Sequence, residues 1–128
     1  MASTFYEEQS PKTPLIELNP ETGVFQLKGK SVPENTIQFY KPMFEWLDEY
    51  KQRPAKATTL NVQLDYFNTS SAKILADLFK TIENLKNNGK SEVAINWQYQ
   101  DIDEEMQEAG EGYKSIIKAP FNLVSFKK

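Results

Sequence analysis

Hydrophobic and polar positions alternate strictly in two separate parts of the chain. Residues 58–67 and residues 91–100 each place apolar side chains at every second position, which predicts strands with one apolar face. The two apolar faces consist of Leu60, Val62, Leu64 and Tyr66, and of Val93, Ile95, Trp97 and Tyr99.

Two other stretches have the helical period. Residues 71–89 repeat apolar side chains every three or four positions, and Asn88 with Gly89 is typical of a helix end. Residues 30–54 have the same period, but Pro42 interrupts it, which predicts a kink or a restart of that helix. The apolar stripes comprise Ile74, Leu75, Leu78, Phe79, Ile82 and Leu85, and Ile37, Tyr40, Phe44, Leu47 and Tyr50.

Shorter patterns predict the remaining elements. Residues 14–29 hold two apolar runs around a turn in which Gly23 can adopt a positive φ, so we expect a β-hairpin. Residues 101–112 form an acidic, weakly helical segment, and residues 119–126 form a last strand. Residues 1–12 are polar and predict a flexible N-terminal arm, which leaves residues 13–128 as a single regulatory domain.

The order of these elements predicts an α/β fold with a single mixed β-sheet. A helix separates the strands at 58–67 and 91–100, and such a crossover makes the two strands parallel neighbours. One-sided alternation indicates that the helices pack mainly on one face. We expect the other face to be exposed to solvent or to form an interface, because it presents polar side chains. These are Asn61, Gln63, Asp65, Asn96 and Gln98.

Composition excludes several classes of function. The 128 residues include no cysteine and no histidine, which removes disulfides, thiolate nucleophiles, the usual zinc sites and histidine-based catalysis. A net charge of −3, without a basic stripe, disfavours nucleic-acid binding. No apolar run approaches the roughly 20 residues that span a bilayer, and the first residues do not resemble a secretory signal. We therefore expect a cytoplasmic protein without direct membrane insertion.

Three consecutive hydroxyl residues, Thr69 to Ser71, follow the strand at 58–67 and precede a helix. A side-chain oxygen at this position commonly caps the free N–H groups of the first helical turn, and this feature alone favours a cap. The same N–H groups and the helix dipole would also hold a phosphate on Thr69, Ser70 or Ser71. A cap and a phosphorylated switch are therefore both compatible with this segment.

A catalytic nucleophile is a third interpretation of the hydroxyl run. Serine or threonine needs a general base, and without histidine this would be Lys73, Asp65 or another acid. Proximity along the chain is the sole support for such a pair, so a catalytic site is disfavoured. The segment also lacks the glycine frame of a phosphate-binding loop, and no cofactor is expected.

The acidic segment invites a comparison with calcium loops. Asp101, Asp103 and Glu105 alternate as calcium ligands do, but Met106 occupies the position at which such a loop requires glycine, so we expect no metal site. Two interpretations remain equally open: an exposed helix with acids at its start, or a docking patch for a partner. In the second, Ile102 and Met106 would be the apolar centre of the patch or its attachment to the core.

Trp46 lies off the main stripe of the helix at 30–54. Aromatic residues in this helix belong more often to a core than to a binding site. Because tryptophan is enriched at interaction hot spots, an exposed Trp46 is nevertheless a candidate anchor for a partner.

Several motifs together resemble those of the SiaC-type bacterial regulatory phosphoproteins. These motifs are TPLIELNPETGVFQLKGKSVPEN, FYKPMFEWLDEY, LDYFNTSSAKIL and WQYQDIDEEMQEAGE. The resemblance extends from about residue 13 to residue 124. Val32 departs mildly from the pattern, at a position that a larger or aromatic residue usually fills.

The resemblance implies a small, non-enzymatic α/β protein, similar in organisation to the STAS-like anti-sigma-factor antagonists. It also implies a partner-switching module. A dedicated kinase phosphorylates the threonine of the YFNTSS motif, here Thr69, and a PP2C-type phosphatase reverses this. The unphosphorylated form binds and activates a diguanylate cyclase, which raises cyclic di-GMP and promotes aggregation or biofilm formation. An anti-sigma-factor-antagonist-like switch that acts on another partner is the alternative.

The resemblance narrows the switch to Thr69, with Asn68, Ser70, Ser71 and Lys73 as its frame. We expect the docking surface around the 68–73 turn, with the acidic segment as a second contact. The candidate partner-binding residues are Asp65, Phe67, Trp46, Asp101, Asp103 and Glu104.

Overall fold

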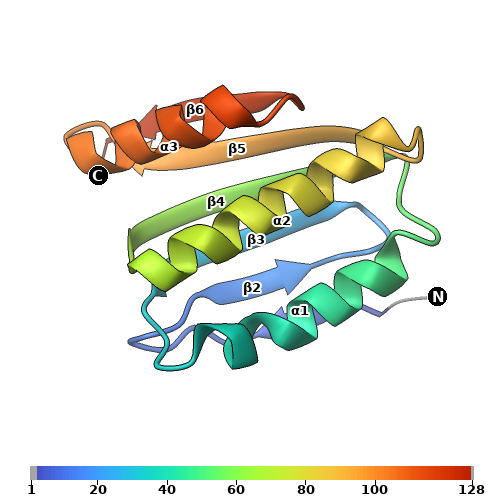
Figure 1. Ribbon diagram of the computed structural model, residues 1–128, viewed down its shortest axis with the longest axis horizontal. Helices are drawn as coiled ribbons and strands as arrows, with labels where there is room; N and C mark the ends of the chain where they lie inside the picture. The colour runs from blue at the N-terminus through green and yellow to red at the C-terminus, as the bar shows by residue number, and fades with distance from the viewer. Residues whose placement is uncertain (1–2, 128) are drawn as a thin grey trace.

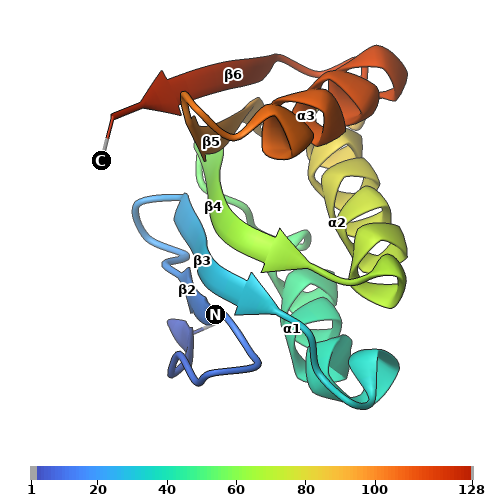
Figure 2. The same cartoon turned by 90° about the vertical axis from the view of Figure 1, so that its left-hand side faces the viewer.

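Six strands form one mixed sheet, and three helices cover one of its faces (Figure 1 and Figure 2). The computed structural model describes residues 3–127. The strands are β1 (Phe5–Glu7), β2 (Leu15–Leu18), β3 (Val24–Ser31), β4 (Ala57–Phe67), β5 (Glu92–Gln100) and β6 (Phe121–Phe126). The helices are α1 (Thr36–Tyr50), α2 (Thr69–Asn87) and α3 (Glu104–Ile116).

The strands lie in the sheet in their order along the chain. β1, β2 and β3 pair antiparallel, whereas β3, β4, β5 and β6 pair parallel. The predicted hairpin, the parallel pair β4–β5 and the placement of the helices on one face are confirmed. Gly23 has a φ of 74° in the hairpin turn, and a Cβ there would lie 1.9 Å from the Ala57 carbonyl oxygen. Glycine is therefore required at this position.

Part of the predicted N-terminal arm belongs to the sheet. Residues Phe5–Glu7 form β1, which pairs with β2, and the indole Nε1 of Trp46 donates a hydrogen bond to the Ser3 carbonyl oxygen at 2.6 Å. A flexible arm is wrong for these residues. The free edge of β2 offers backbone partners to a three-residue strand, which is too short to give a recognisable hydrophobic pattern.

Trp46 is part of the core, so its prediction as an exposed anchor is wrong. Its side chain is 9% exposed, stacks on Tyr50 with ring centroids 5.2 Å apart, and contacts the edge of Phe25. In contrast, Ile37 of the predicted apolar stripe is 76% exposed. α1 is one continuous helix through Pro42, without a restart. Its buried face includes Trp46, because the helix packs over the β2–β3 hairpin.

A register shift changes the end of β4. Gly29 of β3 is opposite Leu64, but Lys30 is opposite Tyr66, so Asp65 is an extra residue in β4. Such a bulge exchanges the faces of the residues that follow. Tyr66, which was predicted on the apolar face, is 55% exposed, and Phe67 packs against Trp97 instead.

A row of asparagines crosses the face of the sheet that the helices leave uncovered. Asn61, Asn96 and Asn122 occupy paired positions on β4, β5 and β6. The Asn96 amide donates to Asn61 Oδ1 at 2.8 Å, and the Asn122 amide donates to Asn96 Oδ1 at 3.0 Å. These bonds satisfy the polar groups of half-buried Asn61 and Asn96, so polar side chains are tolerated on this face of the sheet.

Candidate functional site

All three helices begin at the same edge of the sheet, at the left-hand side of Figure 1. Each helix follows a parallel strand, and each has a side-chain cap: Asn35 for α1, Asn68 for α2 and Asp103 for α3. The cap oxygens accept hydrogen bonds from the backbone N–H groups of Gln38, Ser71 and Met106. Three positive helix-dipole ends therefore face one side of the molecule, which favours negative charge there.

Asn68 is the cap of α2, so the hydroxyl run is free for other roles. Asn68 Oδ1 accepts from the Ser71 N–H at 2.9 Å, and the Asn68 carbonyl accepts from the Ala72 N–H at 3.0 Å. The predicted cap is thus present. The three hydroxyl residues that follow Asn68 have three different environments.

Ser71 is fully buried. Its hydroxyl donates to the Ser31 carbonyl oxygen at 2.9 Å, and its Oγ lies 2.8 Å from Ser31 Oγ. Ser31 Oγ also lies 2.5 Å from the hydroxyl of buried Tyr40. Burial raises the pKa of Tyr40 to about 12, although its hydrogen bond with Ser31 lowers the pKa in part. Ser71 therefore holds the start of α2 against the end of β3.

Ser70 connects the starts of two helices. Its Oγ lies 2.6 Å from Thr36 Oγ1 at the beginning of α1, and its hydroxyl donates to Asn68 Oδ1 at 3.2 Å. Since Thr36 is buried and Ser70 is exposed, this pair closes the outer side of the junction between α1 and α2.

Thr69 is the first residue of α2 and is exposed. Within residues 3–127 its hydroxyl has no hydrogen-bond partner, in contrast to the hydroxyls of Ser70 and Ser71. Lys73 lies one turn further along α2, is exposed, and forms no ion pair in the described part of the chain. Among the described residues, the start of α2 thus carries an exposed, unbonded hydroxyl with an unpaired lysine one turn away.

The predicted acidic residues lie at this same edge of the sheet. Asp65 and Asp103 line two adjoining cavities of about 360 and 120 Å³, and Phe67 contributes to the smaller one. Asp101 and Glu104 are exposed. Among the residues that the structure describes, no group of histidine, cysteine or acidic side chains could hold a metal ion.

Apolar side chains are also exposed at this edge; the sequence pattern suggested this for Ile102, as the centre of a docking patch, but not for Ile37 or Tyr66. Ile37 is 76%, Tyr66 is 55% and Ile102 is 82% exposed, whereas Met106 is buried against the core. Ile37 lies in the first turn of α1, Tyr66 at the end of β4, and Ile102 just before α3. We call the surface formed by Ile37, Tyr66, Thr69 and Ile102 the helix-start edge. Because these exposed apolar side chains come from three elements that end or begin at one edge of the sheet, this edge is a candidate docking surface.

Residues 7–126 match the model of a protein family described as SiaC family regulatory phosphoprotein. The chain belongs to this family. The SiaC family places it among regulatory proteins rather than enzymes. A relative in Pseudomonas aeruginosa strain UCBPP-PA14, an uncharacterized protein, is 27% identical over 111 residues, which cover 87% of each chain.

Solved structures of SiaC from P. aeruginosa have the same fold. Apo-SiaC is 24% identical, with a TM-score of 0.87 over 96% of this chain and 99% of that chain. SiaC in its complex with the diguanylate cyclase SiaD, which it activates, is also 24% identical, with a TM-score of 0.88 over 95% and 99% of the two chains. In residues 3–127, no helix is long and apolar enough to cross a membrane.

Proposed function

We propose that this protein, in its unphosphorylated form, binds and activates a diguanylate cyclase, and that phosphorylation of Thr69 prevents this. A dedicated kinase adds the phosphate and a PP2C-type phosphatase removes it. The activated cyclase raises cyclic di-GMP and thereby promotes aggregation or biofilm formation. Membership of a family of regulatory phosphoproteins and the likeness to the SiaC of a SiaC–SiaD complex support the proposal.

The exposure of Thr69 is the observation on which the assignment of the phosphosite depends. A kinase must reach the hydroxyl, and burial of Ser71 excludes it from the folded protein. Ser70 is exposed but engaged with Thr36 and Asn68. A phosphate on Thr69 would accept hydrogen bonds from N–H groups at the start of α2 and would attract Lys73.

Phosphorylation would change the binding surface without changing the fold. It adds roughly −1.5 to −2 charges to the edge of the sheet at which Ile37, Tyr66 and Ile102 are exposed. A partner that covers these apolar side chains would have to remove water from the dianion, which is costly. The buried contact of Ser71 with Ser31 does not involve the Thr69 side chain, so it remains intact.

Reconstitution with the diguanylate cyclase of the native host tests the proposal. We expect cyclic di-GMP synthesis to rise with the unphosphorylated chain and with Thr69→Ala, and to stay at the basal rate with the phosphorylated chain. The rate with Thr69→Asp should lie between these limits, because a carboxylate carries one negative charge and is smaller than a phosphate group. Thr4→Asp is the matched control, since exposed Thr4 precedes β1 at the opposite edge of the sheet.

Two outcomes would contradict the proposal. Mapping of protein from its native host would exclude the switch if Thr69 never carried phosphate. Equal activation of the cyclase by the phosphorylated and unphosphorylated chains would exclude the blocking role of the phosphate. Binding to a kinase-like anti-sigma factor, with no binding to a cyclase, would instead establish the switch that acts on another partner.

A further inference from the structure

We propose that the end of the molecule opposite the helix-start edge holds a binding site for a small anion that carries phosphate groups. A hollow of about 310 Å³ opens there, beside the end of α2 and the start of β5, at the right-hand side of Figure 1. This volume is at the lower end of the range for small-molecule sites. We call it the lysine hollow, and the residues that line it are Lys56, Lys86, Gly89, Lys90, Ser91 and Glu92.

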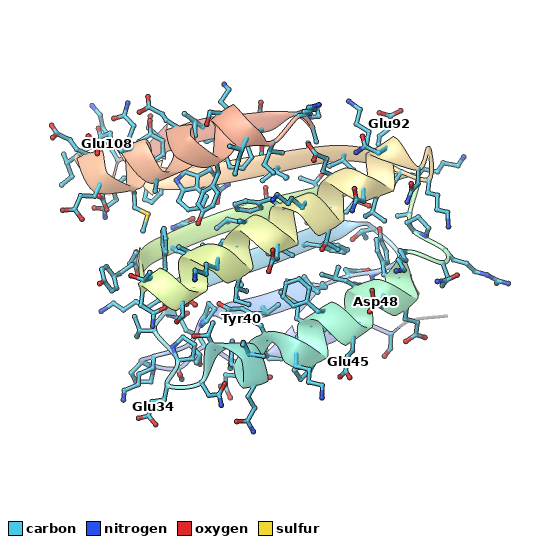
Figure 3. The ribbon with its side chains drawn as sticks, in the orientation of Figure 1. Glu34, Tyr40, Glu45, Asp48, Glu92 and Glu108 are labelled. Carbon is cyan, nitrogen blue, oxygen red and sulfur yellow. The ribbon has the colours of Figure 1, made fainter. Side chains whose placement is uncertain are left out.

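Three lysines from separate parts of the chain converge on the lysine hollow. Lys56 precedes β4, Lys86 lies in the last turn of α2, and Lys90 precedes β5. All three are exposed, and none forms an ion pair within residues 3–127. Glu92, which Figure 3 labels at this end of the molecule, is the one acid among the described residues that line the hollow.

The positive charge of the lysine hollow exceeds what the end of α2 requires. The C-terminal end of a helix carries about half a negative charge, which a single lysine in the last turn would offset. With Glu92 as the one lining acid in the described part of the chain, the three lysines leave a net charge of roughly +1.5. The hollow therefore attracts an anion, although the whole protein has a net charge of −3.

A buried hydroxyl network holds together the two segments that form the hollow. Ser91 is 7% exposed, donates to the Ala55 carbonyl oxygen at 2.7 Å, and has its Oγ 2.8 Å from Thr58 Oγ1. Thr58 Oγ1 lies 2.8 Å from the hydroxyl of Tyr50, which accepts from the Ala55 N–H at 3.0 Å. The backbone positions from which the lysines extend are thus fixed relative to each other.

The lysine side chains, rather than backbone groups, must recognise the anion. The N–H groups of Gly89, Lys90 and Ser91 already donate to carbonyl oxygens in the last turn of α2. Lys90 Nζ donates to the Lys51 carbonyl oxygen at 3.3 Å, which orients this ammonium group and leaves two of its three N–H donors for a ligand.

The lining of the hollow defines the chemistry of the ligand. Lysine ammonium groups bind phosphate as point charges, and three of them on separate segments suit an anion whose charge is spread over several oxygen atoms. Among the described residues, no aromatic side chain lines the hollow, so the site offers no stacking platform for a nucleotide base. We therefore expect recognition of the phosphate groups themselves.

Soluble polyphosphates and the head groups of acidic phospholipids both supply this chemistry, and two probes distinguish them. The first is tripolyphosphate, measured by calorimetry at low salt. The second is sedimentation with vesicles of cardiolipin and phosphatidylcholine, with pure phosphatidylcholine as control. Binding of tripolyphosphate alone would identify a soluble ligand, and binding of the cardiolipin vesicles would identify a lipid head group. Absence of binding to both probes would overturn the site.

Charge substitutions test whether the lysine hollow is responsible. Lys86→Gln combined with Lys90→Gln should weaken binding of the probe by about tenfold, because an exposed charge contributes up to about fivefold. Glu92→Gln should strengthen binding by about threefold, since it removes a repelling charge. Lys28→Gln combined with Lys41→Gln is the matched control, because both lysines are exposed and lie outside the hollow. Equal weakening by the two double variants would overturn the site.

Chemical-shift mapping by NMR locates the bound anion. Tripolyphosphate should shift the amide signals of residues 55–57 and 86–92 and leave those of residues 68–73 unchanged. Thr69 and Lys86 are seventeen residues apart, or about 26 Å along α2, so the two ends respond separately. Largest shifts at the start of α2 would overturn the proposal. Thermal unfolding of the variants without ligand should match the wild type, which separates lost binding from lost folding.

Discussion

Ser71 Oγ lies 2.8 Å from Ser31 Oγ, in the buried junction between the end of β3 and the first turn of α2. The two residues are forty positions apart in the chain, and the Ser71 hydroxyl also donates to the Ser31 carbonyl oxygen. This contact fixes the start of α2, so that Thr69, two residues earlier, faces outward. The buried hydroxyl of Ser71 and the exposed hydroxyl of Thr69, the proposed phosphosite, thus lie two residues apart.

Removal of the two hydroxyls should therefore have different effects on stability. Ser71→Ala leaves the Ser31 carbonyl without its side-chain donor, and we expect a loss of about 1–3 kcal/mol in the free energy of unfolding. Thr69→Ala removes an exposed, unbonded hydroxyl and should change stability by less than about 0.5 kcal/mol. Urea unfolding of both variants measures this, and equal losses would contradict the assignment of Ser71 as the structural residue.

Phosphorylation of Thr69 should leave the protein folded and slightly more stable. A phosphate near the start of α2 interacts favourably with the helix dipole, by about 0.3–1 kcal/mol at low ionic strength. Salt should reduce this gain, because the phosphate is exposed. Urea unfolding of the phosphorylated and unphosphorylated chains at low and high salt is the measurement. A large destabilisation would show that the switch acts by unfolding instead of by surface charge.

Two glycines of α3 should respond oppositely to alanine. A Cβ on Gly110 would lie 2.5 Å from Trp97 Cδ1 and 2.7 Å from Leu123 Cδ2, so Gly110→Ala should destabilise the protein by about 1–3 kcal/mol through overpacking. A Cβ on Gly112 meets open space, and Gly112→Ala should stabilise α3 by up to about 1 kcal/mol. Thermal unfolding of the two variants measures this. Stabilisation of both would contradict the close packing of α3 against Trp97 and Leu123.

Tyr40 should make the protein sensitive to alkali. Its folded-state pKa of about 12 exceeds the unfolded value of about 10, so its contribution is complete below pH 10 and is lost as the pH rises towards 12. Tyr40→Phe loses the Ser31 hydrogen bond and should be about 1 kcal/mol less stable near neutral pH. At about pH 11 the wild type should have lost about 1.4 kcal/mol that phenylalanine, which does not ionise, does not lose, so the variant should then be slightly the more stable of the two.

Tyr113 does not obscure the comparison of wild type with Tyr40→Phe. Burial also raises the pKa of Tyr113 to about 12, but Tyr113 is present in both proteins and its effect cancels. Urea unfolding at the two pH values measures the change, and a difference that stayed constant would contradict the burial of an ionisable Tyr40.

Local patterns were sufficient to predict most elements of this fold. The alternation in β4 and β5, the apolar stripe of α2 and the cap signal at Asn68 each depend on residues that are close together in the sequence. The pattern failed where a distant segment decided the outcome. The short strand β1 depends on the free edge of β2, and Trp46 is buried by Phe25 and by Ser3. The exposure of Tyr66 depends on a bulge against β3.

The amino-acid sequence by itself determined the α/β class, the parallel pairing of β4 with β5, and a helix start that contains three hydroxyl residues. Physical arguments from the sequence could not tell which of the three hydroxyls is accessible for modification, since all three have similar chemistry and adjacent positions. Only the tertiary structure decided that Ser71 is buried against Ser31, that Ser70 contacts Thr36 and that Thr69 is exposed. The reason is that exposure and hydrogen bonding depend on the neighbours that β3 and α1 bring from more than thirty residues away.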